Sequence, residues 1–189
     1  MVDEISCFDK IHWWQFPLND YSVKINDIYK TKFFNRISIE RNKSLEFANY
    51  LNKKSKKYDK NWNFKKQREL VWDYKINADF IPAWFVYESA KYLKLDLFEI
   101  EKNIISYLSY RGRIEVYPKL PIKVTPEFSG LLSHMICDGT VRADRFFYFQ
   151  KNKDHLKRFF DITKNVFGEY YTKPKRGISV PLIFKKIIS

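Results

Sequence analysis

The chain has 189 residues, of which 45% are hydrophobic and 19% aromatic, a composition that supports a folded core and excludes a globally disordered protein. Its formal net charge of +13 favours a polyanionic partner, with nucleic acid ahead of an anionic membrane surface. Because the chain has only two cysteines and no apolar run of about 18 residues, we expect neither a disulfide framework nor a membrane span, and predict a location inside the cell, in the cytoplasm or with the nucleoid.

Residues 1–79 form an N-terminal region rich in aromatic residues and lysine. Two of its segments, Val23–Ile28 and Arg36–Ile39, alternate apolar and polar residues and predict strands. Residues 41–68 contain ten Lys or Arg against two acidic residues, and aromatic residues interleave with the lysines. This window fits phosphate contact supported by base stacking, or a solvated basic helix and loop. Both interpretations stay open.

Residues 80–118 contain two short helical patterns. Pro82 suits the first turn of a helix that runs to about Leu93. Asp96 and Glu99 then form a capping-box pattern, and the apolar spacing predicts a second helix that continues to about residue 108. The pair is typical of a helix-turn-helix, with Lys94 in the turn where a glycine is usual. A purely structural helical hairpin is the alternative.

Thr125 suits the N-cap and Pro126 the first turn of a short apolar helix. The stretch from Phe128 to Val141 continues this helix, which ends on the carboxylate Asp138 and is stopped by Gly139. A carboxylate is disfavoured in the last turn of a helix, so a bound cation is one candidate for what offsets it. Ser133 and Cys137 lie four residues apart on one face, which lets a second helix approach closely.

The residues after this helix predict two strands (140–143 and 145–150) and a helix that Asp154 caps and Gly168 ends. A second hairpin of two strands (169–172 and 178–180) and a last helix (182–188) would follow. We therefore expect an α+β protein. Its N-terminal part would be mainly helical with a helix-turn-helix-like segment, and residues 119–189 would form an αββαββα unit with a short antiparallel sheet.

The segment Leu131-Leu-Ser-His-Met-Ile-Cys-Asp-Gly139 resembles the LAGLIDADG motif of homing endonucleases, and the element order after it is similar to one repeat of that family. The resemblance implies double-stranded DNA as partner and a homodimer that forms through the helix 128–138, packed at Ser133 and Cys137. It implies Mg²⁺ held at Asp138 and Gly139, with Gln150 and Lys151 as further catalytic residues. The activity implied is site-specific, Mg²⁺-dependent cleavage of both DNA strands.

The DNA-contact candidates combine basic residues of the last third of the chain with one aromatic residue on a predicted strand. They are Arg111, Arg113, Arg142, Arg145, Tyr148, Lys173, Lys175 and Arg176. In this interpretation Phe147 and Phe149 would pack on the following helix, while Tyr148 and Gln150 would face outward. Two alternatives to the nuclease stay open: a DNA-binding regulator or domesticated remnant that does not cleave, and an RNA-binding splicing factor.

Overall fold

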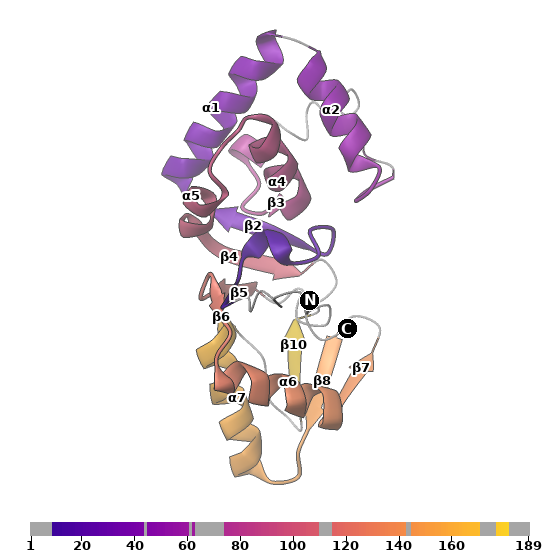
Figure 1. Cartoon of the computed structure of the whole chain (residues 1–189), viewed down its shortest axis with the longest axis vertical. Coiled ribbons are helices and arrows are strands. Elements are labelled where there is room, and N and C mark those ends of the chain that lie inside the picture. Colours follow the sequence, from indigo (N-terminus) through magenta and orange to yellow (C-terminus); the bar gives the residue numbers. More distant parts are fainter. Residues whose placement is uncertain are drawn as a thin grey trace, which may run out of the picture.

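The computed structural model describes residues 9–43, 45–60, 62, 74–109, 115–142, 145–170 and 177–181. It is elongated (Figure 1), with α1, α2 and α4 at one end and α6 and α7 at the other. An α+β architecture is confirmed. Within the described part of the chain, no helix is both long and apolar enough to cross a membrane.

A five-stranded antiparallel sheet lies at the centre of the molecule, in the order β3-β2-β4-β5-β9. Its best-buried strand is β2 (Tyr21–Ile25), which pairs with β4 (Ile104–Ser109) along most of its length. The two-residue strand β3 (Ile81–Pro82) extends one edge of the sheet, and β5 (Glu115–Pro118) lies beyond β4. Of the two predicted N-terminal strands, the first is present in part as β2, which ends at Ile25 because residues 27–28 already belong to the following helix.

The second predicted strand, Arg36–Ile39, is wrong, because these residues lie inside the helix α1 (Asp27–Lys43). Asn26 begins this helix by accepting a hydrogen bond from the backbone N–H of Tyr29 at 2.8 Å. The core face of α1 carries Phe33, Phe34 and Ile37. These residues share one face of a helix, and their burial favours the helix over the strand that the short alternation of isoleucines with polar residues predicts.

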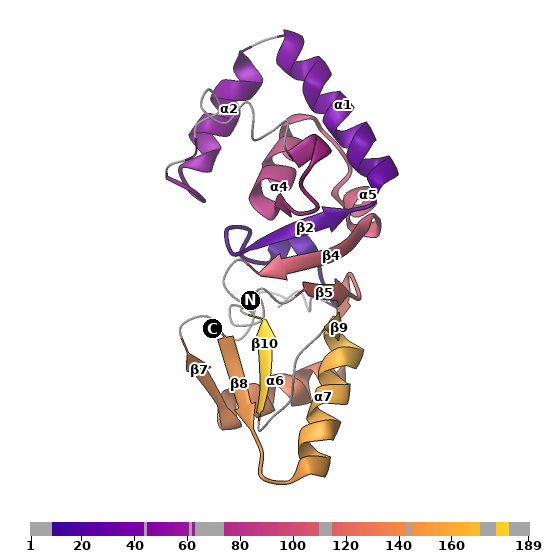
Figure 2. The same ribbon diagram turned by 180° about the vertical axis from the view of Figure 1, so that it is seen from behind.

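Helix α2 (Glu46–Ser55) packs against α4 (Ala83–Tyr92) above the sheet (Figures 1 and 2). Nearly every residue of α4 from Ala83 to Ala90 is buried, so α4 is the central helix of this part. The basic window contributes Phe47, Leu51 and Trp62 to the same core.

The predicted helical pair is present, but its second member is short. Helix α5 (Leu97–Lys102) begins at Asp96, whose carboxylate accepts the N–H of Phe98 at 2.9 Å. The expected continuation of this helix to residue 108 is wrong, because Ile104–Ser109 is β4. β-Branched residues fit a strand well, and long-range pairing with β2 decided the outcome over helical spacing.

The C-terminal part contains a three-stranded antiparallel sheet in the order β10-β8-β7. Helix α6 (Pro126–Asp138) leads directly into β7 (Gly139–Arg142), which forms a hairpin with β8 (Arg145–Phe149) as predicted. Helix α7 (Lys153–Phe167) follows and packs on α6. Its cap is Asn152 rather than the expected Asp154, since the Asn152 side chain accepts the N–H groups of residues 154 and 155.

The predicted second hairpin of this part is wrong. Strand β9 (Gly168–Tyr170) pairs with β5 of the central sheet, whereas β10 (Gly177–Pro181) pairs with β8. The predicted last helix, 182–188, lies outside the described residues.

The two ends of the molecule are joined by backbone pairing at two places. One is the β5–β9 ladder, and the other is the pairing of β1 (Lys10–Ile11) with β6 (Ile122–Lys123). The predicted division between 1–79 and 80–118 does not separate two bodies, because β2 and β3 are neighbours in one sheet. Residues 119–189 likewise contribute β9 to the sheet of the preceding region.

Candidate nucleic-acid interface

Helix α6 carries the motif on which the sequence interpretation rests. The Thr125 hydroxyl accepts the N–H of Phe128 at 3.3 Å, and Pro126 occupies the first turn, so the helix begins where the sequence predicts. Phe128, Leu131 and Met135 form its buried face. Their spacing of three and four residues leaves the opposite face toward solvent.

The outward face of α6 is made of small residues. Ser129, Gly130, Ser133 and Cys137 are all exposed, and the Ser133 hydroxyl donates to the carbonyl of Ser129 at 3.0 Å. A Cβ atom built on Gly130 would meet no atom of the described part of the chain within 4 Å. Next to this stripe, Ile136 leaves 63% of its surface exposed. The predicted interface residues Ser133 and Cys137 therefore lie on one accessible surface of the described chain.

The predicted metal-binding position lies at the end of this helix. Asp138 is the last residue of α6, and Gly139 is already the first residue of β7 rather than a separate turn. Gly139 pairs with Tyr148 across the hairpin, which fixes the end of α6 against β8. Among the described residues, no three His, Cys, Asp or Glu side chains converge on a point that could hold a metal ion.

Tyr148 does not have the outward orientation expected of a DNA contact. It is 3% exposed and stacks on Phe159 of α7, with ring centroids 3.9 Å apart and planes 11° from parallel. The helix-facing side of β8 is therefore the side of Tyr148, the reverse of the expected alternation. Phe159 of α7 favours this orientation of β8, because Tyr148 gains a stacked aromatic partner in the core.

Gln150 and Lys151 follow directly after β8 and diverge in environment. Lys151 is exposed, whereas Gln150 is half-buried and its carbonyl oxygen accepts the N–H of Asn152 at 3.4 Å. Gln150 lines a cavity of about 540 Å³ between α6 and α7. The other polar lining residues are Glu127, His134, Tyr148, His155 and Arg158. Gln150 therefore belongs to the helix-covered side of the sheet.

For the remaining DNA-contact candidates, the structure describes either the backbone alone or nothing. Arg142 and Arg145 face each other across the β7–β8 hairpin as its last described pair. The other five candidates lie outside the described residues: Arg111, Arg113, Lys173, Lys175 and Arg176.

Two described aromatic residues of the basic window pack in the core or against it and are not open stacking platforms. Trp62 is 5% exposed and packs edge-on against Trp84. Tyr58 also packs on Trp84, with the two rings stacked and their centroids 5.7 Å apart. The stacking half of the sequence interpretation is therefore wrong for these two residues, while Lys56, Lys57 and Lys60 of the same window are exposed.

Sequence reasoning did not identify Gly130 and Glu88 as notable. Gly130 extends the small stripe of α6 toward its N-terminus, and its signal is a glycine inside a helix with small residues at helical spacing. Glu88 is buried at 4% exposure in α4 and accepts hydrogen bonds from two tyrosine hydroxyls. Its signal is a carboxylate inside an otherwise apolar helix.

Comparisons with known proteins returned no match: no family model, curated protein or solved structure resembles the chain closely enough to be matched.

Proposed function

We propose that this protein binds double-stranded DNA as a homodimer formed through α6, and that it cleaves a specific site as a Mg²⁺-dependent endonuclease of LAGLIDADG type. The observation that carries the proposal is the accessible stripe of small residues on α6, with Gly130 facing open space.

The small residues on the outward face of α6 leave room for a second helix to pack against it, which supports self-association. A glycine inside a helix costs about 0.5–1 kcal/mol relative to alanine, and among the described residues no neighbouring atom needs the space that Gly130 leaves. Close approach of a second helix would use that space and would cover Ile136, which a single chain leaves exposed. A second copy of α6 fits because an isologous dimer places the same patch on both sides.

The catalytic part of the proposal needs both copies. Mg²⁺ at phosphate-processing sites is usually held by one or two carboxylates together with waters and substrate phosphates, and in the dimer the two copies of Asp138 would supply these carboxylates. When bound, the metal would supply the activation of water and the stabilisation of charge for phosphodiester hydrolysis. The two-fold symmetry of such a dimer implies a near-palindromic target.

A DNA-binding protein that does not cleave is the second candidate. It is favoured by the small size of the C-terminal sheet, which has three strands because β9 joins the central sheet instead. The burial of Tyr148 removes one further expected DNA contact from that sheet. The RNA-binding alternative has no observation of its own in the described residues.

The dimer is tested by the replacement Gly130→Leu, measured by sedimentation velocity of the full chain. We expect the wild type to sediment as a dimer and the variant as a monomer. Lys157→Leu adds the same side chain at an exposed position of α7 and serves as the matched control, because it should leave the dimer intact. A monomeric wild type would contradict the proposal.

Cleavage is tested by digesting a plasmid library of random sequence in Mg²⁺ with the wild type and with Asp138→Asn. Site-specific cuts that disappear in the variant support the endonuclease and identify its target. Salt-sensitive retention of duplex DNA by both proteins without cuts supports the second candidate. Failure of both proteins to retain DNA would sink both.

A further inference from the structure

We infer that α2 and α4 form a second surface for nucleic acid, which holds the phosphates of a duplex without reading its bases. We call this surface the lysine–tyrosine face. It comprises Lys53, Lys54, Lys56, Lys57, Lys60 and Lys91 with Tyr50, Tyr58 and Tyr87. It lies in the N-terminal part, apart from α6, and rests on the proposed function only in sharing DNA as the partner.

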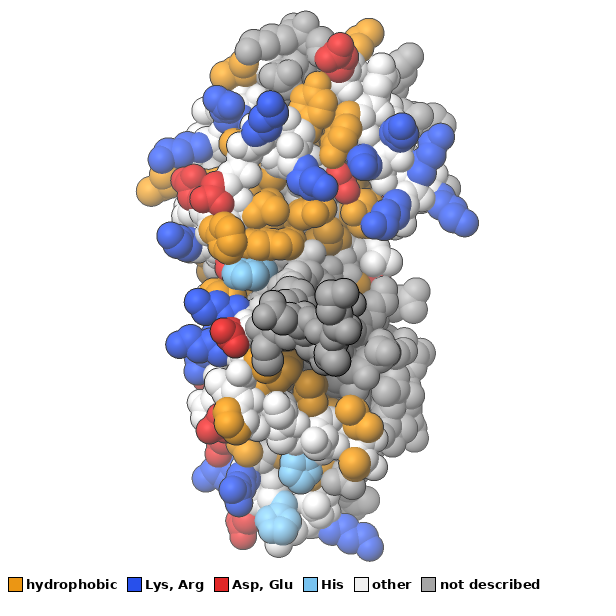
Figure 3. Space-filling model, viewed as in Figure 1, with side chains coloured by type: hydrophobic (Ala, Val, Ile, Leu, Met, Phe, Trp, Pro, Cys, Tyr) orange, Lys and Arg blue, Asp and Glu red, His pale blue; other side chains and the backbone are white. Residues whose placement is uncertain are grey.

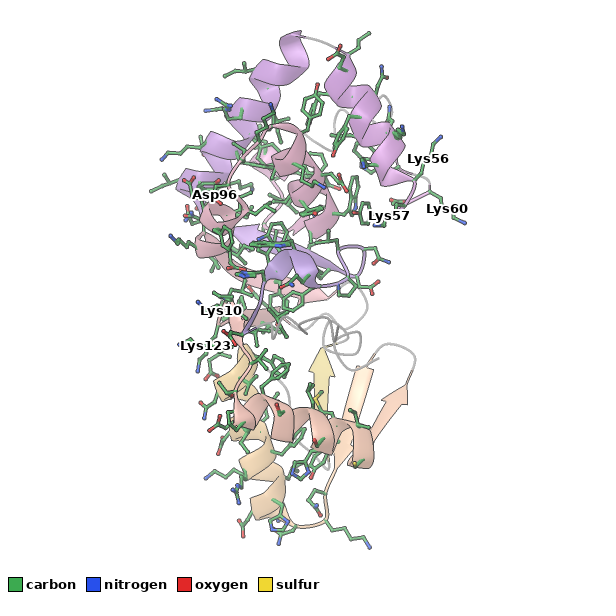
Figure 4. All side chains as sticks on the ribbon, viewed as in Figure 1. Lys10, Lys56, Lys57, Lys60, Asp96 and Lys123 are labelled. Carbon is green, nitrogen blue, oxygen red and sulfur yellow. The ribbon has the colours of Figure 1, made fainter. Side chains whose placement is uncertain are left out.

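The lysine–tyrosine face carries a large excess of positive charge. Residues 46–60 and 83–92 carry the six lysines against three acidic residues, of which Glu88 is buried and accepts hydrogen bonds from tyrosines. Figure 4 shows Lys56, Lys57 and Lys60 together at the edge of the molecule where α2 ends. In Figure 3, basic side chains border apolar ones over α2 and α4. A dense positive edge of this kind attracts a polyanion.

Three lysines of the face are held in place by tyrosine rings. Three ammonium groups lie over tyrosine rings: Lys54 over Tyr50 at 5.6 Å, Lys57 over Tyr58 at 5.4 Å, and Lys91 over Tyr87 at 5.4 Å. Each distance is within the range of a cation–π interaction, which restricts the lysine without neutralising its charge. The ammonium group keeps donors for a phosphate oxygen.

The tyrosines themselves are held from beneath. The hydroxyls of Tyr50 and Tyr58 donate to the two oxygens of Glu88 at 2.8 and 2.9 Å. Because Glu88 is buried in α4, it ties α2 and the following turn to the central helix. The tyrosines that contact the lysines are therefore fixed to the protein core.

The tyrosine rings of the face are not free to stack on bases, so the face should contact phosphates. Base stacking requires an open ring face, but Tyr58 stacks on Trp84 and Tyr50 packs on Tyr92 with centroids 5.0 Å apart. Their other contacts include the lysine ammonium groups. With the rings engaged on protein and lysine, binding should be independent of sequence and strongly dependent on salt.

Duplex nucleic acid fits this face better than an anionic membrane does. Helices that lie on a membrane bury an apolar face in the lipid. In α2 the apolar residues Phe47 and Leu51 are buried in the protein core instead. These two side chains are therefore not available for insertion into lipid, and the exposed Leu45 lies at the start of α2, at the opposite end of the helix from Lys56, Lys57 and Lys60.

The test is fluorescence anisotropy of labelled random-sequence duplexes with the full chain, between about 50 and 200 mM salt. The variant replaces four of the five exposed lysines of the face by glutamine, those of α2 and the turn after it: Lys53, Lys56, Lys57 and Lys60. The control makes the same replacement at four exposed lysines of other elements: Lys10, Lys32, Lys102 and Lys123. Figure 4 shows Lys10 and Lys123 at the opposite edge of the molecule from Lys56, Lys57 and Lys60. Both variants therefore lose the same formal charge.

We expect the face variant to bind about tenfold or more weakly at low salt than the control, with the slope of log affinity against log salt reduced by about 3 to 4. Equal losses in both variants, or no loss in either, would overturn the inference. Lysine-dependent binding of phosphatidylserine vesicles without binding of duplex DNA would overturn it in favour of a membrane.

The same preparations separate this inference from the proposed function. Lysine-dependent DNA binding by a chain that neither dimerises through α6 nor cleaves would support the face and contradict the proposed function. Dimerisation and cleavage with unaltered affinity in the face variant would leave the proposed function standing and reject the face.

Discussion

Tyr58 donates its hydroxyl hydrogen to the buried carboxylate of Glu88 at 2.9 Å, and so joins the turn after α2 to the centre of α4. Tyr50 makes the equivalent bond to the other oxygen at 2.8 Å. We expect Tyr58→Phe and Tyr50→Phe each to lower the free energy of unfolding by about 1–2 kcal/mol, because a buried charged acceptor loses a donor.

The double variant should lose more than the sum of the two single variants, since Glu88 is then left without either tyrosine donor. Urea unfolding of all four proteins in a double-mutant cycle measures this. Additive losses would show that water or another group replaces the tyrosines. Tyr117→Phe, at an exposed residue of β5, is the control and should change little.

The same pair makes stability sensitive to alkaline pH. Burial, and then the hydrogen bond to Glu88, raises the pKa of Tyr50 and of Tyr58 well above the ordinary value. A raised folded-state pKa gives stability that is complete below the unfolded-state pKa of about 10 and is lost as pH rises toward the folded-state pKa. We therefore expect unfolding free energy to fall above about pH 10.

Burial also raises the pKa of Tyr29 to about 12, so part of this alkaline loss will persist without the pair. The difference between wild type and the Tyr50→Phe, Tyr58→Phe double variant isolates the contribution of Glu88. Chemical unfolding across that pH range measures it, and identical slopes in both proteins would contradict the assignment.

Gly168 is the position where a side chain is least tolerated. Its φ of +104° is rare for other residues, and a Cβ there would lie 2.0 Å from the carbonyl oxygen of Tyr117. We expect Gly168→Ala to lower the unfolding free energy by about 2 kcal/mol or more, because the β5–β9 ladder must shift. Thermal unfolding followed by circular dichroism measures the loss.

Gly130→Ala is the matched control for that substitution. It adds the same methyl group where no atom lies within 4 Å, and a helix interior favours alanine over glycine. Within a single chain the substitution should therefore be neutral or stabilising by about 0.5–1 kcal/mol, so wild type and variant are compared at a concentration too low for two chains to pair through α6. A comparable loss at both glycines would show that the strain is not specific to Gly168.

Lys94 has a φ of 54°, in the left-handed region that favours glycine. It closes α4 through hydrogen bonds from its own N–H to Lys91 at 3.3 Å and from the N–H of Leu95 to Ala90 at 2.9 Å, the pattern of a Schellman motif. We expect Lys94→Gly to stabilise the protein by about 0.5–1 kcal/mol. Urea unfolding measures this, with Lys91→Gly inside α4 as the control that should destabilise it.

Features encoded over short distances could be predicted from sequence. The turn at Lys94, the cap at Asp96 and the start of α6 at Thr125 depend on neighbouring residues, and the structure contains all three. The β7–β8 hairpin was also predictable, because its strands are separated by a short turn.

Features that depend on distant partners could not be predicted in the same way. Ile104–Ser109 matches helical spacing in isolation, and only pairing with β2, far away in the sequence, makes it a strand. Tyr148 could face either side of β8 until Phe159 of α7 supplies a stacked partner. For the candidate site, the sequence pointed to Ser133 and Cys137, but the open space beside Gly130 is a property of the packed chain.

The pairing of β9 with β5 has a further consequence for how the protein would occupy DNA. Three residue pairs of this ladder, from Val116 opposite Tyr170 to Pro118 opposite Gly168, join the part that holds α6 to the sheet beneath α4. Hydrogen-bonded strands stretch far less than a flexible linker of the same length. The distance between α6 and the lysine–tyrosine face is therefore set by the fold, and the length of duplex that one chain protects from nuclease digestion should be constant from one DNA sequence to another.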